Sequence, residues 1–399
     1  MSAAVAETLT WPSIISRGFK TSRRTLPGLL LAGVTLLTFS LTCAAETVAQ
    51  EKSYVSRARE VMEHIEKTYG KEDSDLYSKL TTDPSPEDMW GNGVMFSALV
   101  GAARHDPEKY TPVMHKFFTA MDAYWDAKAK IPGYEPLPTP GGGKDKYYDD
   151  NAWMVITFLE AYELTRDSRY LTRAEQTLEF VLSGWDDEGG GGIWWHEGHK
   201  EGTKNTCANA PTAVSCLRLA KYSDAQTAEK LTARARQIVE WTVATFRDED
   251  GLYWDSKNLA TGHINRAKLT YNSALMLRSF LGLHQRTGKP EDLAEAQRIG
   301  KAADAFMGRR RWVVYRNHVK WSHLMVEADL ELYRTTKEEY LLKRTKQNAD
   351  FHYERWKTNP PPDLIAHASI ARQLWLMADM ETETGRKFWE AADKPKDSK

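Results

Sequence analysis

The sequence predicts an all-α protein, an (α/α)6 toroid in which six helical hairpins build an inner and an outer ring of helices. The first observation is a helix-loop-helix phrase that recurs at intervals of about 60 residues, which fits one hairpin with its connections. The second is an alternation between helices that are apolar on every side and helices with only an apolar stripe. The residues that close successive copies of the phrase are Tyr110, Tyr170, Leu231 and Leu293, spaced 60, 61 and 62 residues apart, and Tyr340 follows after 47.

Two successive hairpins show the alternation between helices. Residues 151–164 and 275–281 are apolar nearly all round, which is typical of buried helices. Residues 171–181 and 293–306 keep their apolar residues on one stripe, with charged residues between them, which is typical of surface helices. We therefore expect each hairpin to place its first helix in the inner ring and its second helix in the outer ring. No sustained strand pattern interrupts this order.

One folded domain is predicted from residue 50 to residue 386. Hydrophobic residues make up 41% and charged residues 27% of the chain, as in an ordinary soluble globular protein. The Gly- and Pro-rich segment 132–143 and the three prolines at 360–362 predict loops, because the helical pattern resumes on both sides of each. Residues 387–399 are charged and contain a proline, and we expect them to form a flexible tail.

The first 45 residues have the layout of an export signal. Basic residues in segment 17–24 precede an apolar run over residues 29–41, and Cys43 and Ala45 are the small residues that a cleavage site needs. The alternative is a retained membrane anchor, because residues 26–45 carry no charge. Either way we expect the mature protein to be secreted or periplasmic, or to be anchored outside the cytoplasm. If the segment is cleaved, Cys43 is lost and Cys207 and Cys216 remain, as buried thiols or as a disulfide.

Charge and aromatic content indicate the class of partner. Lysine and arginine number 54 and aspartate and glutamate 55, so the formal net charge is −1 and no basic excess is available for nucleic acid. The 14 tryptophans and 17 tyrosines exceed what the core needs, and aromatic faces commonly line concave ligand sites. We expect a monomer that binds a polysaccharide or oligosaccharide, with no nucleic-acid partner and no membrane contact unless the N-terminal segment is retained.

Adjacent carboxylates begin one of the predicted inner helices. Asp149 and Asp150 follow a Gly-rich loop and precede the apolar helix. The positive end of a helix favours one ionised carboxylate, whose charge then raises the pKa of its neighbour. A pair with opposed protonation is what glycoside hydrolysis requires. The alternative is helix capping, for which one aspartate suffices.

A second unusual segment follows the next predicted helix. Residues 189–192 are four glycines, and Trp194 and Trp195 come directly after them. The segment lacks the Lys-Ser/Thr ending of a phosphate loop. His196 and His199 lie three residues apart, whereas two-histidine zinc helices use a spacing of four, so we expect no metal and no cofactor. The later phrase at 250–255, again acidic-Gly-aromatic, either lines the same rim or packs it.

An ordered set of motifs resembles glycoside hydrolase family 76 over roughly residues 55–380. The motifs are Tyr148-Asp149-Asp150-Asn151-Ala152-Trp153, Gly190-Gly-Gly-Ile-Trp-Trp195, Lys204-Asn205 and Thr270-Tyr271-Asn272. The resemblance implies an (α/α)6 toroid and retaining, endo-acting hydrolysis of α-1,6-linked mannan, with Asp149 as nucleophile and Asp150 as general acid/base. A late helix of the family often has Phe-Lys-Gly where this chain has Val319-Lys320-Trp321, which leaves the exact glycan open.

Further residues are candidates for substrate contacts, with core packing or capping as the alternative for each. Candidates for stacking on sugars or for hydrogen bonds to them are Trp90, Tyr148, Asn151, Trp194, Trp195, Asn205, Tyr271 and Asn272. Three other functions stay open: a cell-wall transglycosidase, a non-catalytic glycan-binding protein and a sugar 2-epimerase, whose fold is similar. Epimerases of that kind use histidine pairs, and the histidines at 263, 318 and 323 lie in no matching motif.

Overall fold

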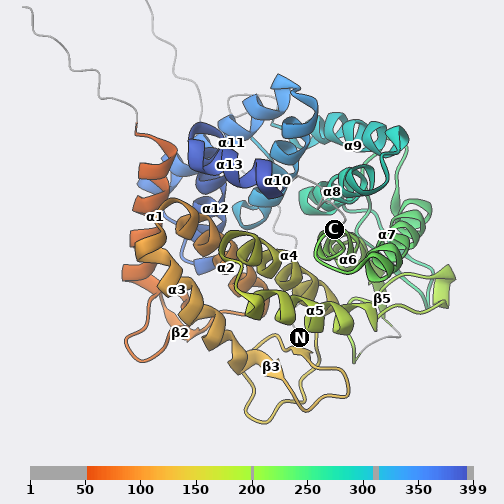
Figure 1. Ribbon diagram of the computed structural model, residues 1–399, viewed down its shortest axis with the longest axis horizontal. Helices are drawn as coiled ribbons and strands as arrows, with labels where there is room; N and C mark the ends of the chain where they lie inside the picture. The colour runs from red at the N-terminus through yellow and green to blue at the C-terminus, as the bar shows by residue number, and fades with distance from the viewer. Residues whose placement is uncertain (1–51, 199–201, 309–313, 393–399) are drawn as a thin grey trace, which may run out of the picture. The chain divides into compact units, whose positions relative to one another are not determined.

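The computed structural model describes residues 52–198, 202–308 and 314–392, which form thirteen α-helices and three small antiparallel sheets. The predicted export segment, residues 1–45, lies outside these residues. Six helices form an inner ring (Figure 1): α2 (Met89–His105), α4 (Tyr148–Thr165), α6 (Thr206–Leu219), α8 (Thr270–Thr287), α10 (Val319–Thr336) and α12 (Leu364–Glu381). Each packs against the next in this order, and α12 packs against α2 and closes the ring. The predicted (α/α)6 toroid is confirmed.

The outer ring consists of the helices that pair with these six. They are α1 (Tyr54–Tyr69), α3 (Pro107–Ala120), α5 (Ser168–Leu182), α7 (Ala225–Phe246), α9 (Pro290–Ala302) and α11 (Glu339–Thr358). Helix α1 packs on α12, and each of the others packs on the inner helix that precedes it. Helix α4 is buried on nearly every side, whereas α5 buries one stripe. The predicted division between buried and surface helices is therefore confirmed for this hairpin, and α8 and α9 repeat it.

Short strands order the loops between helices. Strands β1 (Ser78–Leu80) and β2 (Asp83–Pro86) pair, as do β3 (Trp125–Asp126) and β4 (Gly133–Tyr134). The third sheet joins β5 (Thr203–Asn205), β6 (Ser256–Asn258) and β7 (Ile264–Asn265). Because β5 leads directly into α6 and β7 precedes α8, this sheet fixes the entry of two neighbouring inner helices.

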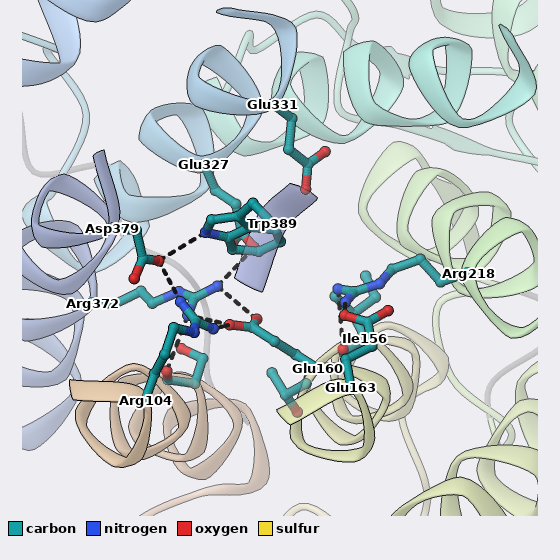
Figure 2. Close-up of polar contacts among 12 residues, drawn as sticks. Arg104, Ile156, Glu160, Glu163, Arg218, Glu327, Glu331, Arg372, Asp379 and Trp389 are labelled. Carbon is teal, nitrogen blue, oxygen red and sulfur yellow. Dashed lines mark hydrogen bonds and ion pairs between the residues drawn. The ribbon is translucent and has the colours of Figure 1, made fainter. Parts of the chain in front are cut away.

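A buried network of charged side chains links the inner helices to one another (Figure 2). Arg372 of α12 donates from both Nη atoms to Glu160 of α4, at 2.8 and 2.7 Å, and also to Glu327 of α10 at 2.8 Å. Arg104 of α2 bonds to the same glutamate at 2.5 Å and to Asp379. Burial alone would raise the pKa of Glu160, but the two guanidinium groups hold it below its ordinary value. The network thus joins four inner helices through fully paired carboxylates.

The C-terminal part of the described chain differs from our expectation. We expected a charged, flexible tail over residues 387–399, but helix α13 (Glu383–Ala392) covers residues 387–392, and residues 393–399 lie outside the described residues. Trp389 of α13 is buried, and its indole nitrogen donates to Asp379 of α12 at 2.8 Å (Figure 2). This contact anchors α13 on α12. Among the helices of the described residues, none has the length and apolar character that a bilayer span requires.

Candidate active site

The first turns of the inner helices meet at one rim of the ring, which we call the N-terminal rim. Asp149, at the start of α4, contacts Cys207 at the start of α6. The ring centroid of Tyr271 in α8 lies 5.6 Å from that of Trp321 in α10. The ring of Trp321 lies in turn 6.2 Å from Trp90 of α2. Residues far apart in the sequence are therefore brought to one place by the ring.

Asp149 accepts hydrogen bonds on both carboxylate oxygens. The indole Nε1 of Trp195 donates to Oδ2 at 3.0 Å, and Sγ of Cys207 donates to the same oxygen at 3.4 Å. The backbone N–H of Asp150 donates to Oδ1 at 3.0 Å. Burial raises the pKa of Asp149 to about 6, and these donors oppose the rise because they favour the ionised form.

Asp150 has a different environment. No hydrogen bond reaches its carboxyl group from the residues that the structure describes. Burial, followed by the charges of Asp149 and Asp88, raises the pKa of Asp150 well above its ordinary value. The pair is therefore unequal: Asp149 ionises first, and Asp150 then keeps its proton.

Neither aspartate is the N-cap residue of α4. The N-cap residue of α4 is Tyr147, which makes no side-chain capping bond, and both aspartates lie inside the first turn. The expected effect of the helix end is only partly seen. Burial raises the pKa of both groups, the donors around Asp149 limit the rise there, and the charge of Asp149 raises the pKa of Asp150 further, as expected.

The four-glycine loop is built around a buried lysine. Nζ of Lys204 donates to Oδ1 of Asp186 at 2.6 Å and to the carbonyl oxygens of residues 188 and 191, each at 2.8 Å. Gly192 has a φ of +91°, and a Cβ there would lie 2.5 Å from the ring of Trp241, so a larger residue would push the loop off its support. The loop thereby holds the two tryptophans that follow it in fixed directions.

Those two tryptophans have opposite roles. Trp194 is 1% exposed, its indole nitrogen donates to Asp186 at 2.6 Å, and Lys204 lies 4.9 Å above its ring. Our prediction that Trp194 stacks on a sugar is therefore wrong, because no face of it is open. Trp195 is 36% exposed beside Asp149, as a sugar-stacking residue would need to be.

Two other candidates are also structural. Tyr148 is fully buried, with its ring stacked on Phe180 at 4.9 Å. Asn151 is buried and bonds only to backbone: its amide donates to the carbonyls of Tyr134 and Tyr147, and its Oδ1 accepts from the N–H of Tyr134. Both side chains are buried and engaged in these contacts within the protein, so the predictions that they bind a sugar are corrected. The two side chains instead anchor the start of α4, where the aspartate pair lies.

Asn205 and Asn272 do present free acceptors at the N-terminal rim. Both side chains are buried, and in each the Oδ1 atom has no hydrogen-bond partner among the described residues. Nδ2 of Asn272 donates to Oδ1 of Asp255 at 3.3 Å. Unpaired buried oxygens are costly, and hydroxyl groups of a bound sugar would satisfy them. The remaining candidates, Tyr271 and Trp90, are half-buried at the same rim.

A small hollow lies between the inner helices on the inner side of this rim. It runs from Trp90 and Trp153, the latter one turn after the aspartate pair, to the charged network at Glu160 and Arg372. Trp90 is the candidate residue that lines this hollow, and the aspartate pair is not part of its lining.

Sequence reasoning missed three residues of this site as individual candidates. Asp255 closes the acidic-aromatic phrase at 250–255, which pointed to this rim without singling it out. Trp321 lies in the motif that departs from the family pattern. Cys207 has no local signal, because its role depends on a contact between two helices. Cys207 and Cys216 are both free and buried, so of our two expectations the thiols are confirmed.

Solved structures of similar fold include two from bacteria. A family 76 α-mannanase of Bacteroides thetaiotaomicron matches with a TM-score of 0.77 and 24% identity, over 84% of this chain and 96% of that one. An inactive variant of the α-1,6-mannanase of Salegentibacter sp. HEL1_6, with two aspartates changed to asparagine and α-1,6-mannotriose bound, matches with a TM-score of 0.71 and 21% identity, over 82% and 99%. At these identities the likeness establishes the fold.

Sequence comparison places the chain in a family. The meiotically up-regulated gene 191 protein of Schizosaccharomyces pombe is 28% identical over 223 residues, which are 51% of this chain and 49% of that protein. The chain thus matches about half the length of this curated relative. The family model for glycosyl hydrolase family 76 matches residues 53–358, well over half of the chain, and the protein therefore belongs to this family.

Proposed function

We propose that the protein is a retaining endo-glycosidase that cleaves α-1,6-linked mannan or a related α-mannoside glycan. The main support is that Asp149 and Asp150, at the N-terminal rim, differ in their hydrogen bonds and in their pKa. Asp149 is held by three donors, and Asp150 has none among the described residues and a pKa well above its ordinary value. One group is thus ready to act as an anion and the other as an acid.

The reaction would proceed in two steps. The Asp149 carboxylate attacks the anomeric carbon while Asp150 gives its proton to the departing glycosidic oxygen, which leaves a glycosyl ester on Asp149. Asp150, now a carboxylate, takes a proton from water as the water oxygen attacks the same carbon and releases Asp149. Two inversions leave the configuration of the sugar unchanged.

The hydrogen bonds to Asp149 fit both steps. Donors that favour its ionised form also stabilise it as a leaving group when the glycosyl ester is hydrolysed. Trp195, which supplies one donor, is 36% exposed beside Asp149, so that its ring is available to stack on a sugar. Asn205 and Asn272 supply acceptors for sugar hydroxyl groups.

The choice of α-1,6-mannan rests on relatives. The similar Salegentibacter protein is an α-1,6-mannanase, and its inactive variant with two neighbouring aspartates replaced carries α-1,6-mannotriose. That pair parallels the adjacent Asp149 and Asp150 in this chain. The basic and apolar segment within residues 1–45 supports export, so that the substrate would be an extracellular or cell-wall glycan.

The same two carboxylates can transfer the glycosyl group to a sugar hydroxyl in place of water. The decisive experiment incubates the purified protein with α-1,6-, α-1,2- and α-1,3-linked mannans and identifies the products by mass spectrometry in 18O-labelled water. We expect internal cleavage of the α-1,6 polymer with one 18O at the new reducing end. Longer unlabelled products would assign a transglycosidase, and binding of the polymer without any product would overturn the enzyme proposal.

A further inference from the structure

The start of α10 places a lysine against two tryptophans at the N-terminal rim. Nζ of Lys320 lies 5.4 Å from the ring centroid of Trp90 and 5.1 Å from that of Trp321. The two indole rings are inclined by only 25° to each other. All three side chains are half-buried, so each keeps a solvent-accessible part. The ammonium group is thus held by cation–π contacts in a defined place rather than swinging freely in solvent.

This group offers only hydrogen-bond donors. Among the described residues no carboxylate lies within 4 Å of Nζ of Lys320, and none accepts a hydrogen bond from it. Nε1 of Trp321 is buried and also lacks an acceptor in the described part of the chain. An ammonium and an indole N–H have no acceptor atoms, so a group that satisfies both must be an acceptor.

The other side of the rim presents hydrogen-bond acceptors instead of donors. There Asp149, Asp255 and the free Oδ1 atoms of Asn205 and Asn272 are acceptors. Tyr271 connects the two sides, because its ring lies 5.6 Å from Trp321 and its pKa is raised by burial and by the nearby charges of Cys207, Asp255 and Asp149. A neutral sugar, whose hydroxyls both donate and accept, would suit the acceptor side but has no need of a cation.

We propose that Lys320 and Nε1 of Trp321 form a subsite for an oxyanion substituent, a phosphate or a carboxylate, on one sugar of the bound glycan. The inference rests on the proposed function, since it assigns a preferred substrate class to the same site. The ring centroids of Trp90 and Trp321 lie 5.4 and 5.1 Å from the ammonium, and no carboxylate of the described residues neutralises it, so its charge is available to attract an anion. Charge-assisted hydrogen bonds of this kind are the strong ones in proteins.

The test compares three α-1,6-mannotetraoses: an unsubstituted one, one with a 6-phosphate on the non-reducing mannose, and one with a mannuronate at that end. We expect kcat/KM for at least one charged substrate to exceed that for the neutral one by about tenfold at low salt, and the preference to shrink as salt rises. The phosphate and mannuronate arms show which oxyanion is preferred. Lys320→Gln and Trp321→Phe, which keeps the ring without the N–H, should each reduce the preference.

A matched control lies on the same helix. Lys337, at the other end of α10, also stacks on an aromatic ring, 5.7 Å from Tyr333, so Lys337→Gln removes a similar cation–π contact away from the rim. It should leave the preference unchanged. Calorimetry with the Asp150→Asn variant measures the affinity for each tetraose without turnover and should show the same preference.

The outcomes separate the two proposals. Equal kcat/KM and equal affinity for neutral and charged substrates would overturn the oxyanion subsite while leaving mannan hydrolysis intact. A preference that survives Lys320→Gln would overturn it as well. If the protein cleaves none of the tetraoses, the proposed hydrolysis is overturned. The subsite would still be supported if Asp150→Asn binds a charged tetraose more tightly than the neutral one and if adding Lys320→Gln to that variant removes the difference.

Discussion

Sγ of Cys207 lies 3.4 Å from Oδ2 of Asp149, and this contact joins the first turn of α6 to that of α4. A thiol is a weak donor, so the contact stabilises the ionised carboxylate only modestly. Cys207→Ala removes the donor and should move the acidic limb of the kcat/KM profile to higher pH by about half a pH unit or more. Cys207→Ser supplies a stronger donor and should move it to lower pH. Cys216→Ala, which removes a buried thiol from the same helix, is the control and should move neither limb.

Replacement of either aspartate should abolish turnover for different reasons. Asp149→Asn and Asp150→Asn should each lower kcat on mannan by about a thousandfold or more, since nucleophile and acid are both required. An activated aryl mannoside, whose leaving group needs no proton, should restore the first step for Asp150→Asn and not for Asp149→Asn. Azide should then give Asp150→Asn a product of retained configuration. Near-normal activity of both variants on the polymer would rule out the site.

The stability of these variants provides an independent check. In the unfolded chain Asp150 loses its proton near its ordinary pKa, whereas burial keeps the folded form protonated to higher pH. Folding therefore takes up a proton, and this residue makes the fold less stable as pH rises through that window. Asp150→Asn removes the effect, so its Tm at pH 7 should equal or exceed that of the parent. A large loss of Tm would show that the activity loss reflects misfolding.

The pH dependence of activity follows from the same pair. Asp149 must be ionised, and burial raises its pKa to about 6, so kcat/KM should rise as pH increases toward and past that value. Asp150 must be protonated, so activity should fall again at higher pH, where the pair loses its second proton. Initial rates measured from pH 4 to 9 should therefore give a bell-shaped dependence of kcat/KM on pH. A plateau that extends down to pH 4 would contradict the burial-raised pKa of Asp149.

The neighbouring tryptophans should respond differently to truncation. Trp194→Ala leaves a cavity in the core and should destabilise the fold by about 3–5 kcal/mol in urea unfolding. Trp195→Ala removes an exposed ring and should leave stability nearly unchanged while raising KM. Trp195→Phe keeps a ring without the indole donor to Asp149, and should retain more affinity than the alanine variant. Equal unfolding midpoints for the two alanine variants would contradict these assignments.

The buried charge network should be a sensitive point of the fold. Glu160→Gln leaves Arg372 and Arg104 without their shared carboxylate, and should cost about 3–5 kcal/mol because both cations stay buried. The exposed pair Lys357–Glu354 offers the comparison. Lys357→Gln should change stability by about 0.5 kcal/mol or less. Similar unfolding free energies for the two variants would mean that water reaches the network.

The ring architecture could be predicted because it depends on short-range patterns. An apolar helix such as residues 151–164 must be buried wherever it lies, and the repeated phrase orders the hairpins along the chain. Asp149 and Asp150 were found for a similar reason: two adjacent carboxylates before a buried helix are unusual within one segment.

The orientation of individual side chains could not be predicted in this way. Trp194 and Trp195 are adjacent residues of the same type, and contacts with Lys204 and Asp186 hold the first of them in the core. Asn151 and Asn205 each precede or begin an inner helix, yet a nearby strand satisfies every polar atom of the first and leaves Oδ1 of the second unpaired. Such differences depend on which partners the folded loops bring to each side chain, and the local sequence pattern does not show this.

The contact between α12 and α2 has a consequence for the synthesis of the chain. Helix α2, the first of the inner ring, starts at Met89, and α12, which covers one of its flanks, starts at Leu364. That flank of α2 therefore stays uncovered during synthesis until α12 has left the ribosome. Exposed apolar flanks of this kind make nascent chains prone to aggregate. A transcript truncated after Thr358 would still encode both aspartates, and its product would nevertheless have an open ring and no Arg372 to pair with Glu160. We expect that product to be cleared by quality control rather than to retain partial activity.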